Sequence, residues 1–390
     1  MKSLSEKVSG IASSATLDIA DRAREMKRRG IDVISLSIGE PDFDTPTHIK
    51  VACIDALMRG ETHYAPSRGI PELLQAVAEK IQKENGFPCS PDQVIATAGA
   101  KHAIAMAMEA ALNPGDQVII LDPSWVSYEP CVQLAGGRAV HHRLNPKTFQ
   151  LDDSLGERIT AKTRMIVINS PSNPTGAVLE KKSLALVADL CADYDLLAMS
   201  DEIYEKLVYS KEHISLAAIK DMAERTITIN GFSKAYAMTG WRLGYAVAPL
   251  PIIRQMTKVQ QHGVSHPTTF VMWGGVAALT GDQSCVEAMR KEFEARRDYL
   301  GEELREMKVA SAPADGAFYA FIDARGEDTE VADHWLNKAH VAVTPGAAFN
   351  APGWLRLSYA TAMPQLQEAI RRIKSVWGEA PARAQRKGQF

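Results

Sequence analysis

The sequence has few cysteines, no long apolar run and no excess of charge of one sign. Its five cysteines are widely spaced, without a Cys-x-x-Cys pair or a histidine at metal-ligand spacing, which is typical of a protein of the reducing cytosol and predicts no metal site. No run approaches the roughly 18 apolar residues of a membrane-spanning helix. The first residues, MKSLSEKVSG, also lack the apolar stretch of a signal peptide. We therefore expect a cytoplasmic protein that is neither exported nor bound to a membrane.

Charge and composition indicate an ordinary globular protein. The chain has 44 Lys and Arg against 47 Asp and Glu, so its net charge of −3 gives no general attraction to nucleic acid or to an anionic membrane. With 46% hydrophobic and 23% charged residues, the composition excludes collagen-like and disordered chains. At roughly 150 residues per domain, 390 residues predict two domains. Any basic residues that matter for function must therefore act locally.

Strand-like and helix-like segments alternate from about residue 46 to residue 250. Because each parallel pair of strands needs a crossover connection, this alternation predicts an α/β domain with a mostly parallel sheet covered by helices on both faces. The expected helices are 47–59, 70–85, 101–112, 126–136 and 180–194, and the expected strands are QVIATA, QVIILD, RAVHHRL, RMIVINS, LLAMSD, TITING and GYAVA.

The pattern changes near residue 250. Longer helical segments follow, and the β-type runs GAFYAFID, VAVTPG and WLRLSYA are shorter. This second region predicts a smaller α+β domain. Its expected helices, together with one near the N-terminus, are 12–30, 250–261, 267–280, 283–306, 328–340 and 363–377.

The segment GFSKAYAMTGWRLG, residues 231–244, directly follows the strand TITIN. A lysine at this point, Lys234, is expected at the carboxyl edge of the sheet, where open α/β sheets bind their ligands. Arg242 follows eight residues later, and its charge, with partial desolvation, would lower the pKa of the lysine and make it a Schiff-base nucleophile. For a lone Lys–Arg pair, a solvated surface loop is the better interpretation. The whole 14-residue string is more specific than such a pair and favours a functional site.

That string resembles the lysine signature of the class I/II aminotransferases, which are fold-type I enzymes dependent on pyridoxal phosphate (PLP). Further motifs of this family follow in the expected order from about residue 14 to residue 360. The resemblance implies that PLP is bound to Lys234, and that the chain forms a homodimer with shared active sites. It divides the chain into a large PLP-binding domain, 45–290, and a small domain made of 1–44 and 291–380. An N-terminal arm over about 1–15 and a solvated tail at 381–390 complete the prediction.

The resemblance assigns four residues around the cofactor ring. Asp201, at the end of LLAMSD, matches the carboxylate that keeps the pyridine nitrogen protonated, and Tyr204 matches the tyrosine that donates to the phenolic oxygen. Asn173, in NSPSNPTG, matches the asparagine that bonds this oxygen and the substrate α-carboxylate. Trp125 matches the aromatic that stacks on the ring. Taken singly, a helix N-cap, an ordinary turn and a core tryptophan would account for Asp201, Asn173 and Trp125.

A turn between a strand and a helix is expected to hold the cofactor phosphate. Residues 98–102 lead into AIAMAMEAAL, so their N–H groups would face outward at the positive end of a helix. The resemblance also implies that Tyr64, in HYAPSRG, reaches the cofactor phosphate in the neighbouring subunit of a dimer. The residues that match the phosphate ligands within one chain are Gly99, Ala100, Lys101, Ser233 and Arg242.

Arg356 lies inside an apolar run, WLRLSYA. A charge there is costly to bury unless it is paired, and a guanidinium suits bidentate recognition of a carboxylate. By resemblance Arg356 binds the α-carboxylate of the amino acid, and Gly39, in SIGEPDF, closes over the same group. Tyr359 and Phe349 are interpreted as ordinary packing.

The side-chain pocket of the substrate is less well defined. Ser14, Thr16 and Lys101, with the segments SSAT, GEPDFDTP and PSWVSYEP, resemble the bacterial aspartate/prephenate aminotransferase subgroup, in which such residues meet a distal carboxylate. A solvated lysine at the start of a helix explains Lys101 equally well. His266, in VSHP, departs from the Ser or Asn that is usual there, and it is either a substrate contact or a loop residue.

The resemblance implies a ping-pong transfer of an α-amino group from an L-amino acid, aspartate being favoured, to a 2-oxo acid such as 2-oxoglutarate. An enzyme for aromatic amino acids, prephenate or other neutral substrates remains an alternative. A lyase or synthase on the same fold is another, because it would keep every cofactor residue. A PLP-sensing transcription regulator is disfavoured, since only about 30 residues without a basic face precede the first expected strand.

Overall fold

The computed structural model describes residues 4–11 and 15–377. A seven-stranded sheet, in the order β2-β8-β7-β6-β5-β3-β4, forms its larger part. Strand β8 is antiparallel to both of its neighbours, and the other pairs are parallel, so the mostly parallel sheet is confirmed. The strands are β2 (Val94–Thr97), β3 (Gln117–Asp122), β4 (Arg138–Arg143), β5 (Thr163–Asn169), β6 (Leu197–Asp201), β7 (Thr226–Gly231) and β8 (Gly244–Val247).

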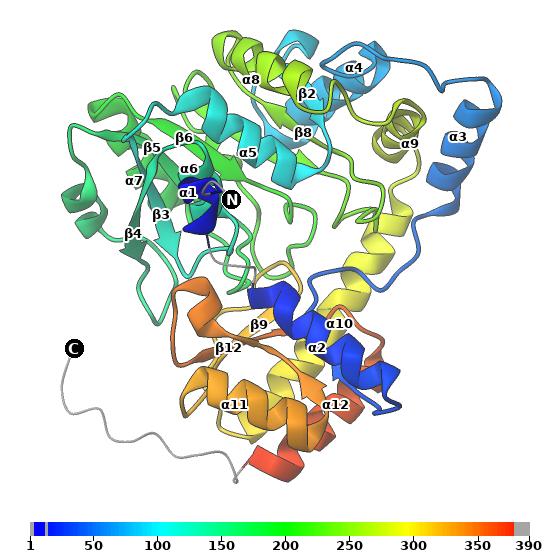
Figure 1. Ribbon diagram of the computed structural model, residues 1–390, viewed down its shortest axis with the longest axis vertical. Coiled ribbons are helices and arrows are strands. Elements are labelled where there is room, and N and C mark those ends of the chain that lie inside the picture. Colours follow the sequence, from blue (N-terminus) through cyan, green and yellow to red (C-terminus); the bar gives the residue numbers. More distant parts are fainter. Residues whose placement is uncertain (1–3, 12–14, 378–390) are drawn as a thin grey trace.

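Helices cover both faces of this sheet (Figure 1). Val118 and Ile120 of β3 belong to the apolar core that also contains residues of α5 (Ala100–Ala111), α6 (Tyr128–Leu134) and α8 (Leu250–His262). The intervening Ile119 belongs to the core on the other side, with residues of α7 (Lys181–Asp193). Alternate residues of one strand thus face two cores, which explains why these strands are apolar throughout.

A third core lies at the β2 end of the sheet. It joins β2 and β8 to α4 (Pro71–Lys80) and α9 (Thr269–Thr280), and α9 packs in turn on α3 (Thr47–Met58). The segment Ile81–Asn85 extends α4 as a π-helix, so the single helix expected over 70–85 changes its hydrogen-bond pattern near its end.

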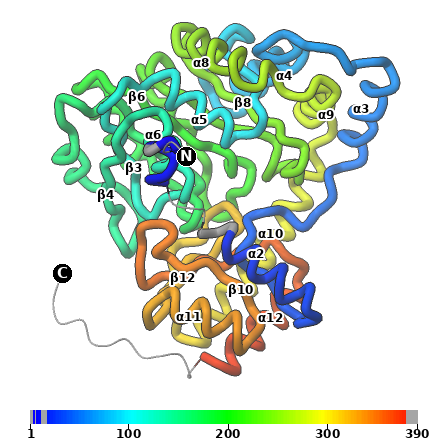
Figure 2. The backbone as a smooth tube through the Cα atoms, in the orientation of Figure 1, coloured from blue at the N-terminus to red at the C-terminus, as the bar shows by residue number. Residues whose placement is uncertain are grey.

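The smaller part of the molecule combines both ends of the chain. Strand β1 (Ile34–Ser35) pairs in parallel with β10 (Val341–Ala342), and Figure 2 shows the N-terminal helix α2 (Ala15–Arg28) beside this region. A three-stranded antiparallel sheet has the order β11-β12-β9. Its strands are β9 (Tyr319–Asp323), β11 (Thr344–Pro345) and β12 (Trp354–Ser358), and the helices beside it are α10 (Ser284–Glu306), α11 (Asp328–His334) and α12 (Met363–Val376).

The expected domain boundary at residue 290 falls within α10, which is one continuous helix from Ser284 to Glu306. The N-terminal arm contains the short helix α1 (Glu6–Ser9), and the tail at 381–390 lies outside the described residues. The domain boundaries therefore stay predictions. Within the described ranges, no helix has the length and apolar character needed to cross a membrane.

Candidate active site

The candidate site lies where the carboxyl ends of the parallel strands meet the small sheet. Asn169, Asp201 and Gly231 end β5, β6 and β7 at one edge, as expected for ligand binding in an open α/β sheet. A cavity of about 500 Å³ opens there. The predicted site residues that line it are Gly39, Ala100, Lys101, Trp125, Asn173, Asp201, Tyr204, Ser233, Lys234, Arg242 and Arg356.

Lys234 follows β7, and its ammonium faces the cavity. Its Nζ donates a hydrogen bond to the carbonyl oxygen of Gly39 at 2.7 Å. Burial, and then repulsion by Arg356 and Arg242, lower its pKa to about 8, although Glu40 acts in the opposite direction. A lysine with this pKa is far more often neutral near pH 7 than an ordinary lysine, so it can act as a nucleophile or a base.

Asp201, the last residue of β6, is a buried carboxylate on the same cavity. The Tyr128 hydroxyl donates to its Oδ2 at 2.7 Å, and the backbone N–H of Ile203 donates to its Oδ1 at 3.3 Å. Burial raises the pKa of Asp201 to about 6, against the effect of these two hydrogen bonds. A protonated nitrogen in front of this carboxylate would hold it ionised.

Tyr204 and Tyr319 join the two parts of the molecule at the cavity. Their hydroxyl oxygens lie 2.7 Å apart. Burial, and then Tyr319, raise the pKa of Tyr204 well above its usual value, so its hydroxyl stays protonated at neutral pH and can donate a hydrogen bond. Gly39 lies against the same pair, because a Cβ at this position would be 2.1 Å from the Tyr319 hydroxyl oxygen.

Arg356, on β12, is 3% exposed and has no carboxylate partner among the described residues. Its Nη1 donates to Asn173 Oδ1 at 2.9 Å and its Nη2 to the Ser37 carbonyl at 2.6 Å, while its Nε is buried without a partner. The guanidinium carbon lies 4.6 Å from the ring centre of Tyr319 and 4.8 Å from that of Phe349. A buried cation held in this way is stabilised when an anion binds beside it.

Arg242 lies beside the turn that begins α5. It has a positive φ of 52°, and its Nη1 donates to the Thr239 carbonyl at 3.0 Å. Gly99 has a φ of 85°, and a Cβ there would be 2.6 Å from Nη2 of Arg242. The helix that follows from Ala100 has no side-chain cap. Its free N–H groups and the guanidinium therefore form an anion site.

Lys101 and Trp125 form another wall of the cavity. The Nζ of Lys101 lies 5.0 Å from the Trp125 ring centre, and burial lowers the pKa of this lysine. Trp125 also meets the Tyr128 ring edge-on at 5.4 Å. The tryptophan is thereby held at the cavity rather than in the interior of the domain.

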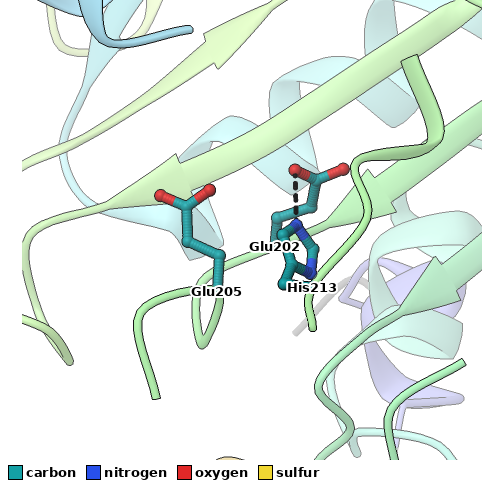
Figure 3. Close-up of side chains that lie close together, drawn as sticks. All are labelled: Glu202, Glu205 and His213. Atoms are coloured by element: carbon teal, nitrogen blue, oxygen red, sulfur yellow. Dashed lines mark hydrogen bonds and ion pairs between the residues drawn. The ribbon is translucent and has the colours of Figure 1, made fainter. Parts of the chain in front are cut away.

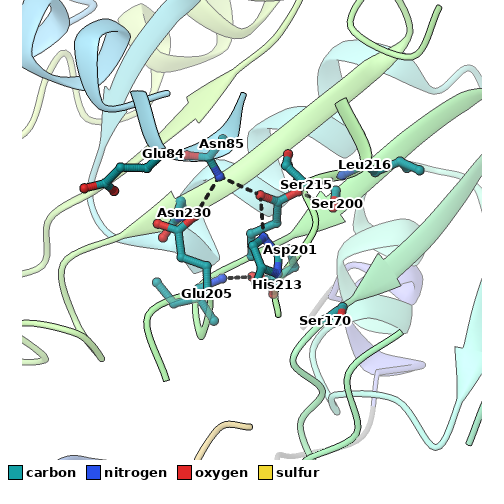
Figure 4. A network of polar contacts seen from close by, with 12 residues as sticks. Glu84, Asn85, Ser170, Ser200, Asp201, Glu205, His213, Ser215, Leu216 and Asn230 are labelled. Atoms are coloured by element: carbon teal, nitrogen blue, oxygen red, sulfur yellow. Dashed lines mark hydrogen bonds and ion pairs between the residues drawn. The ribbon is translucent and has the colours of Figure 1, made fainter. Parts of the chain in front are cut away.

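A buried ionic network lies behind Asp201 (Figure 4). Glu202 Oε1 accepts hydrogen bonds from Ser200, Ser215 and the N–H of Leu216. Its Oε2 faces His213 Nε2 at 3.2 Å, the contact drawn in Figure 3, so this carboxylate ties the segment 213–216 to the turn that carries Asp201.

Glu205 completes the network through Lys80 and Asn85. It pairs with the ammonium of Lys80 and accepts from Asn85 Nδ2 at 2.7 Å. Although burial acts to raise the pKa of Glu205, Lys80 and His213 hold it at about 2. Ligand atoms of Glu202, Glu205 and His213 lie within 4.8 Å of one another. Because Lys80 already neutralises Glu205, we interpret this cluster as structural rather than as a metal centre.

Tyr64 and His266 lie away from the cavity of their own chain. Tyr64 is 92% exposed, and its ring meets the edge of His266 at 5.7 Å. Nε2 of His266 accepts a hydrogen bond from the N–H of Ala65 at 3.2 Å. His266 thus holds the segment that presents Tyr64 to the exterior.

Two predicted substrate residues cannot be compared with the structure. Ser14 lies outside the described residues, and Thr16 is in α2, where its side chain is not described. Sequence reasoning also missed Tyr128, Tyr319 and Arg24, which line the cavity. Phe349, interpreted as ordinary packing, is fully buried in an apolar core as expected, and it also contacts Arg356. Tyr128 stands in the segment PSWVSYEP, three residues after Trp125, but nothing local in the sequence indicates its contact with Asp201.

Comparisons with known proteins agree on one family. The model of the family "Aminotransferase class I and II" matches residues 31–373. The aspartate/prephenate aminotransferase of Thermus thermophilus is 42% identical over 97% of this chain and 100% of its own. Aromatic-amino-acid aminotransferase 2 of Thermococcus litoralis is 44% identical over 90% of this chain and 93% of its own. The structure of Thermus thermophilus aspartate aminotransferase with maleate superimposes with a TM-score of 0.93 at 42% identity, covering 96% of this chain and 100% of that one.

The lowered pKa of Lys234 predicts a pH dependence in the cofactor-free protein. Burial and two arginines favour the neutral amine and lower its pKa to about 8. The rate at which Lys234 reacts with an amine-acylating reagent should therefore rise with pH, with a midpoint near this pKa. Peptide mass spectrometry over a pH series measures the modification of this lysine. The denatured chain is the control and should give the ordinary lysine midpoint of about 10.4. A midpoint in the folded protein equal to that of the denatured chain would contradict the prediction.

Proposed function

Because the chain belongs to the class I and II aminotransferases, we propose that it uses PLP at Lys234 to move the amino group of L-aspartate to 2-oxoglutarate. The family uses PLP, and its members act on amino acids and oxo acids. One observation carries the proposal for this chain. Lys234, whose pKa is lowered to about 8, lines the same cavity as Asp201, Arg242 and Arg356.

The residues around the cavity fit the cofactor. An aldehyde needs a neutral amine, which Lys234 provides, and a pyridine nitrogen needs a carboxylate, which Asp201 provides. A phosphate needs fixed positive charge and N–H donors, which Arg242 and the start of α5 at Ala100 provide. Ser233 lines the same cavity and offers a hydroxyl. Bound PLP supplies a ring that withdraws electrons from the Cα of the amino acid.

The protein groups then have separate tasks. Asp201, oriented by Tyr128, keeps the proton on the ring nitrogen. Lys234 removes the proton from the substrate Cα and delivers it again as a general acid and base. Tyr204 donates a hydrogen bond to the phenolic oxygen, and Arg356 with Asn173 binds the α-carboxylate. Trp125, which lines the cavity, would offer its ring face to the bound cofactor and help to exclude water.

Aspartate is favoured because a cation remains for a second carboxylate. Lys101 lines the cavity without an ion pair among the described residues. The name of the Thermus thermophilus relative supports aspartate or prephenate. The name of the Thermococcus litoralis relative supports aromatic amino acids as the second candidate.

A panel of amino donors with 2-oxoglutarate tests the reaction. We expect glutamate to form in equimolar amount with the new oxo acid, and fastest with aspartate. Phenylalanine, tyrosine and alanine serve as the other amino donors. Prephenate is tested separately as an acceptor, with glutamate as its amino donor. Pyruvate and ammonia released without glutamate would instead support a lyase.

Lys234→Ala should abolish turnover and the visible absorbance of covalently held PLP, because no other amine is expected to replace it. Absorption spectra of the dialysed protein and the glutamate assay measure both effects. Lys220→Ala, a change at an exposed lysine outside the cavity, is the matched control and should leave both unchanged. A Lys234→Ala protein that retains covalent cofactor would refute the assignment.

Lys101→Ala should raise KM for aspartate by about tenfold or more, since a charge-assisted hydrogen bond contributes roughly 1.5–3 kcal/mol. It should change KM for alanine or phenylalanine little. Steady-state kinetics with each donor give the comparison. An equal effect on all donors would assign Lys101 to phosphate binding or to structure.

A homodimer with shared sites predicts complementation. Tyr64→Ala and Lys234→Ala subunits should each be weak or inactive alone. If Tyr64 serves the partner's site, a mixed dimer has one site with both Lys234 and Tyr64 intact, so mixing the two variants under conditions of subunit exchange should restore activity. If Tyr64 serves its own site, every site in the mixed dimer has a defect and no activity returns.

A further inference from the structure

A second hollow lies at the outer edge of the large sheet. It has a volume of about 390 Å³ and shares no residue with the candidate active site. It opens beside the carboxyl ends of β3 and β4, where β4 is the last strand of the sheet. We call it the His142 pocket, and its lining residues are Asp122, His141, His142, Arg143, Ser154, Arg158 and Asn350.

The lining has an excess of positive charge. Arg143 and Arg158 are exposed, and neither guanidinium group has a hydrogen bond or an ion pair within the described part of the chain. Asp122, the carboxylate of this lining, is already occupied, because it pairs with His141 Nδ1 at 2.9 Å and accepts from Ser124 at 2.8 Å. Neither guanidinium group therefore has an ion-pair partner among the described residues, although a second carboxylate, that of Asp152, lies beside the pocket and accepts hydrogen bonds from Ser154.

His142 is the unusual member of the pocket. It is 3% exposed, yet neither of its ring nitrogens has a hydrogen-bond partner among the described residues. An unpartnered buried polar group costs roughly 1–3 kcal/mol. A ligand that reaches into the pocket could bond with a ring nitrogen and offset this cost.

We propose that the His142 pocket binds a small organic dianion, a dicarboxylate or a phosphate monoester. Each arginine can donate a pair of parallel hydrogen bonds to such a group, and His142 can bond with an inner oxygen. The volume of about 390 Å³ lies within the range usual for small-molecule sites, about 300–1,000 Å³. The proposal does not depend on the catalytic assignments.

The pocket also adjoins a segment that supports the active site. Asn350 donates to Asp122 Oδ1 at 3.3 Å. The preceding Phe349, whose ring lies on Arg356, accepts from the N–H of Ser124 at 3.2 Å. An occupant would thus border the residues that join β3 to the small sheet without touching the reacting groups.

Calorimetric titration of the PLP-loaded enzyme tests this site, with glycerol 3-phosphate and succinate as separate probes. The variant Arg143→Ala/Arg158→Ala changes two exposed side chains and should fold normally. Arg138→Ala removes an exposed arginine at the other end of the same strand and is the matched control. We expect the double variant to bind the preferred probe at least about tenfold more weakly, because two charge-assisted contacts are lost, and the control to bind as the wild type does.

The two probes separate the two sources of the dianion. Succinate can also enter the active site, so the wild type is expected to bind it at two sites. If the double variant loses one of these sites and keeps the other, the result supports the pocket. Loss of glycerol 3-phosphate binding alone supports a phosphate monoester. Equal binding of both probes by all three proteins, or no binding by the wild type, would overturn the proposal.

Discussion

The candidate active site depends on one electrostatic constraint, which is a cavity with more cations than anions. Five cationic side chains line it, those of Arg24, Lys101, Lys234, Arg242 and Arg356, against the carboxylates of Glu40 and Asp201. Within the described residues, only Arg24 among the five forms an ion pair, with Asp21. Partly buried cations without counter-charges are costly. Burial, and then repulsion by Arg356 and Arg242, lower the pKa of Lys234, so the arginines that can bind anions also favour the neutral amine.

The rest of the fold holds these charges in place. Lys234 and Asp201 come from the ends of neighbouring strands, β7 and β6, so the sheet sets the distance between the amine and the carboxylate. The network of Glu202, Glu205, His213 and Lys80 fixes the turn between Asp201 and Tyr204 from behind. Arg356 comes from the small sheet and reaches Asn173 of the large part. Both parts of the molecule therefore contribute to one site.

The sequence predicts what is local, and it fails where residues meet over long separations. Strands such as β5 (Thr163–Asn169) and helices such as α7 follow from apolar patterns within a few residues. Lys234 was found through a continuous motif, and Arg356 through the cost of a charge in an apolar run. In contrast, Tyr319 meets Tyr204 across 115 residues, and Tyr128 meets Asp201 across 73. No local pattern marks such pairs, and Phe349 likewise gains its contact with Arg356 only through the fold.

Substrate choice can be argued from the charges that remain after each anion is assigned. In the proposed mechanism the phosphate neutralises Arg242 and the α-carboxylate neutralises Arg356, while Arg24 is already paired with Asp21. Lys234 is bonded to the cofactor in this proposal, so Lys101 is the remaining unpaired cation, held against the Trp125 ring at 5.0 Å. An aromatic side chain would leave this ammonium in a less polar cavity, whereas a distal carboxylate would pair with it. Relatives named for both substrate classes have similar identity, so this charge balance, rather than overall similarity, favours a dicarboxylic amino acid.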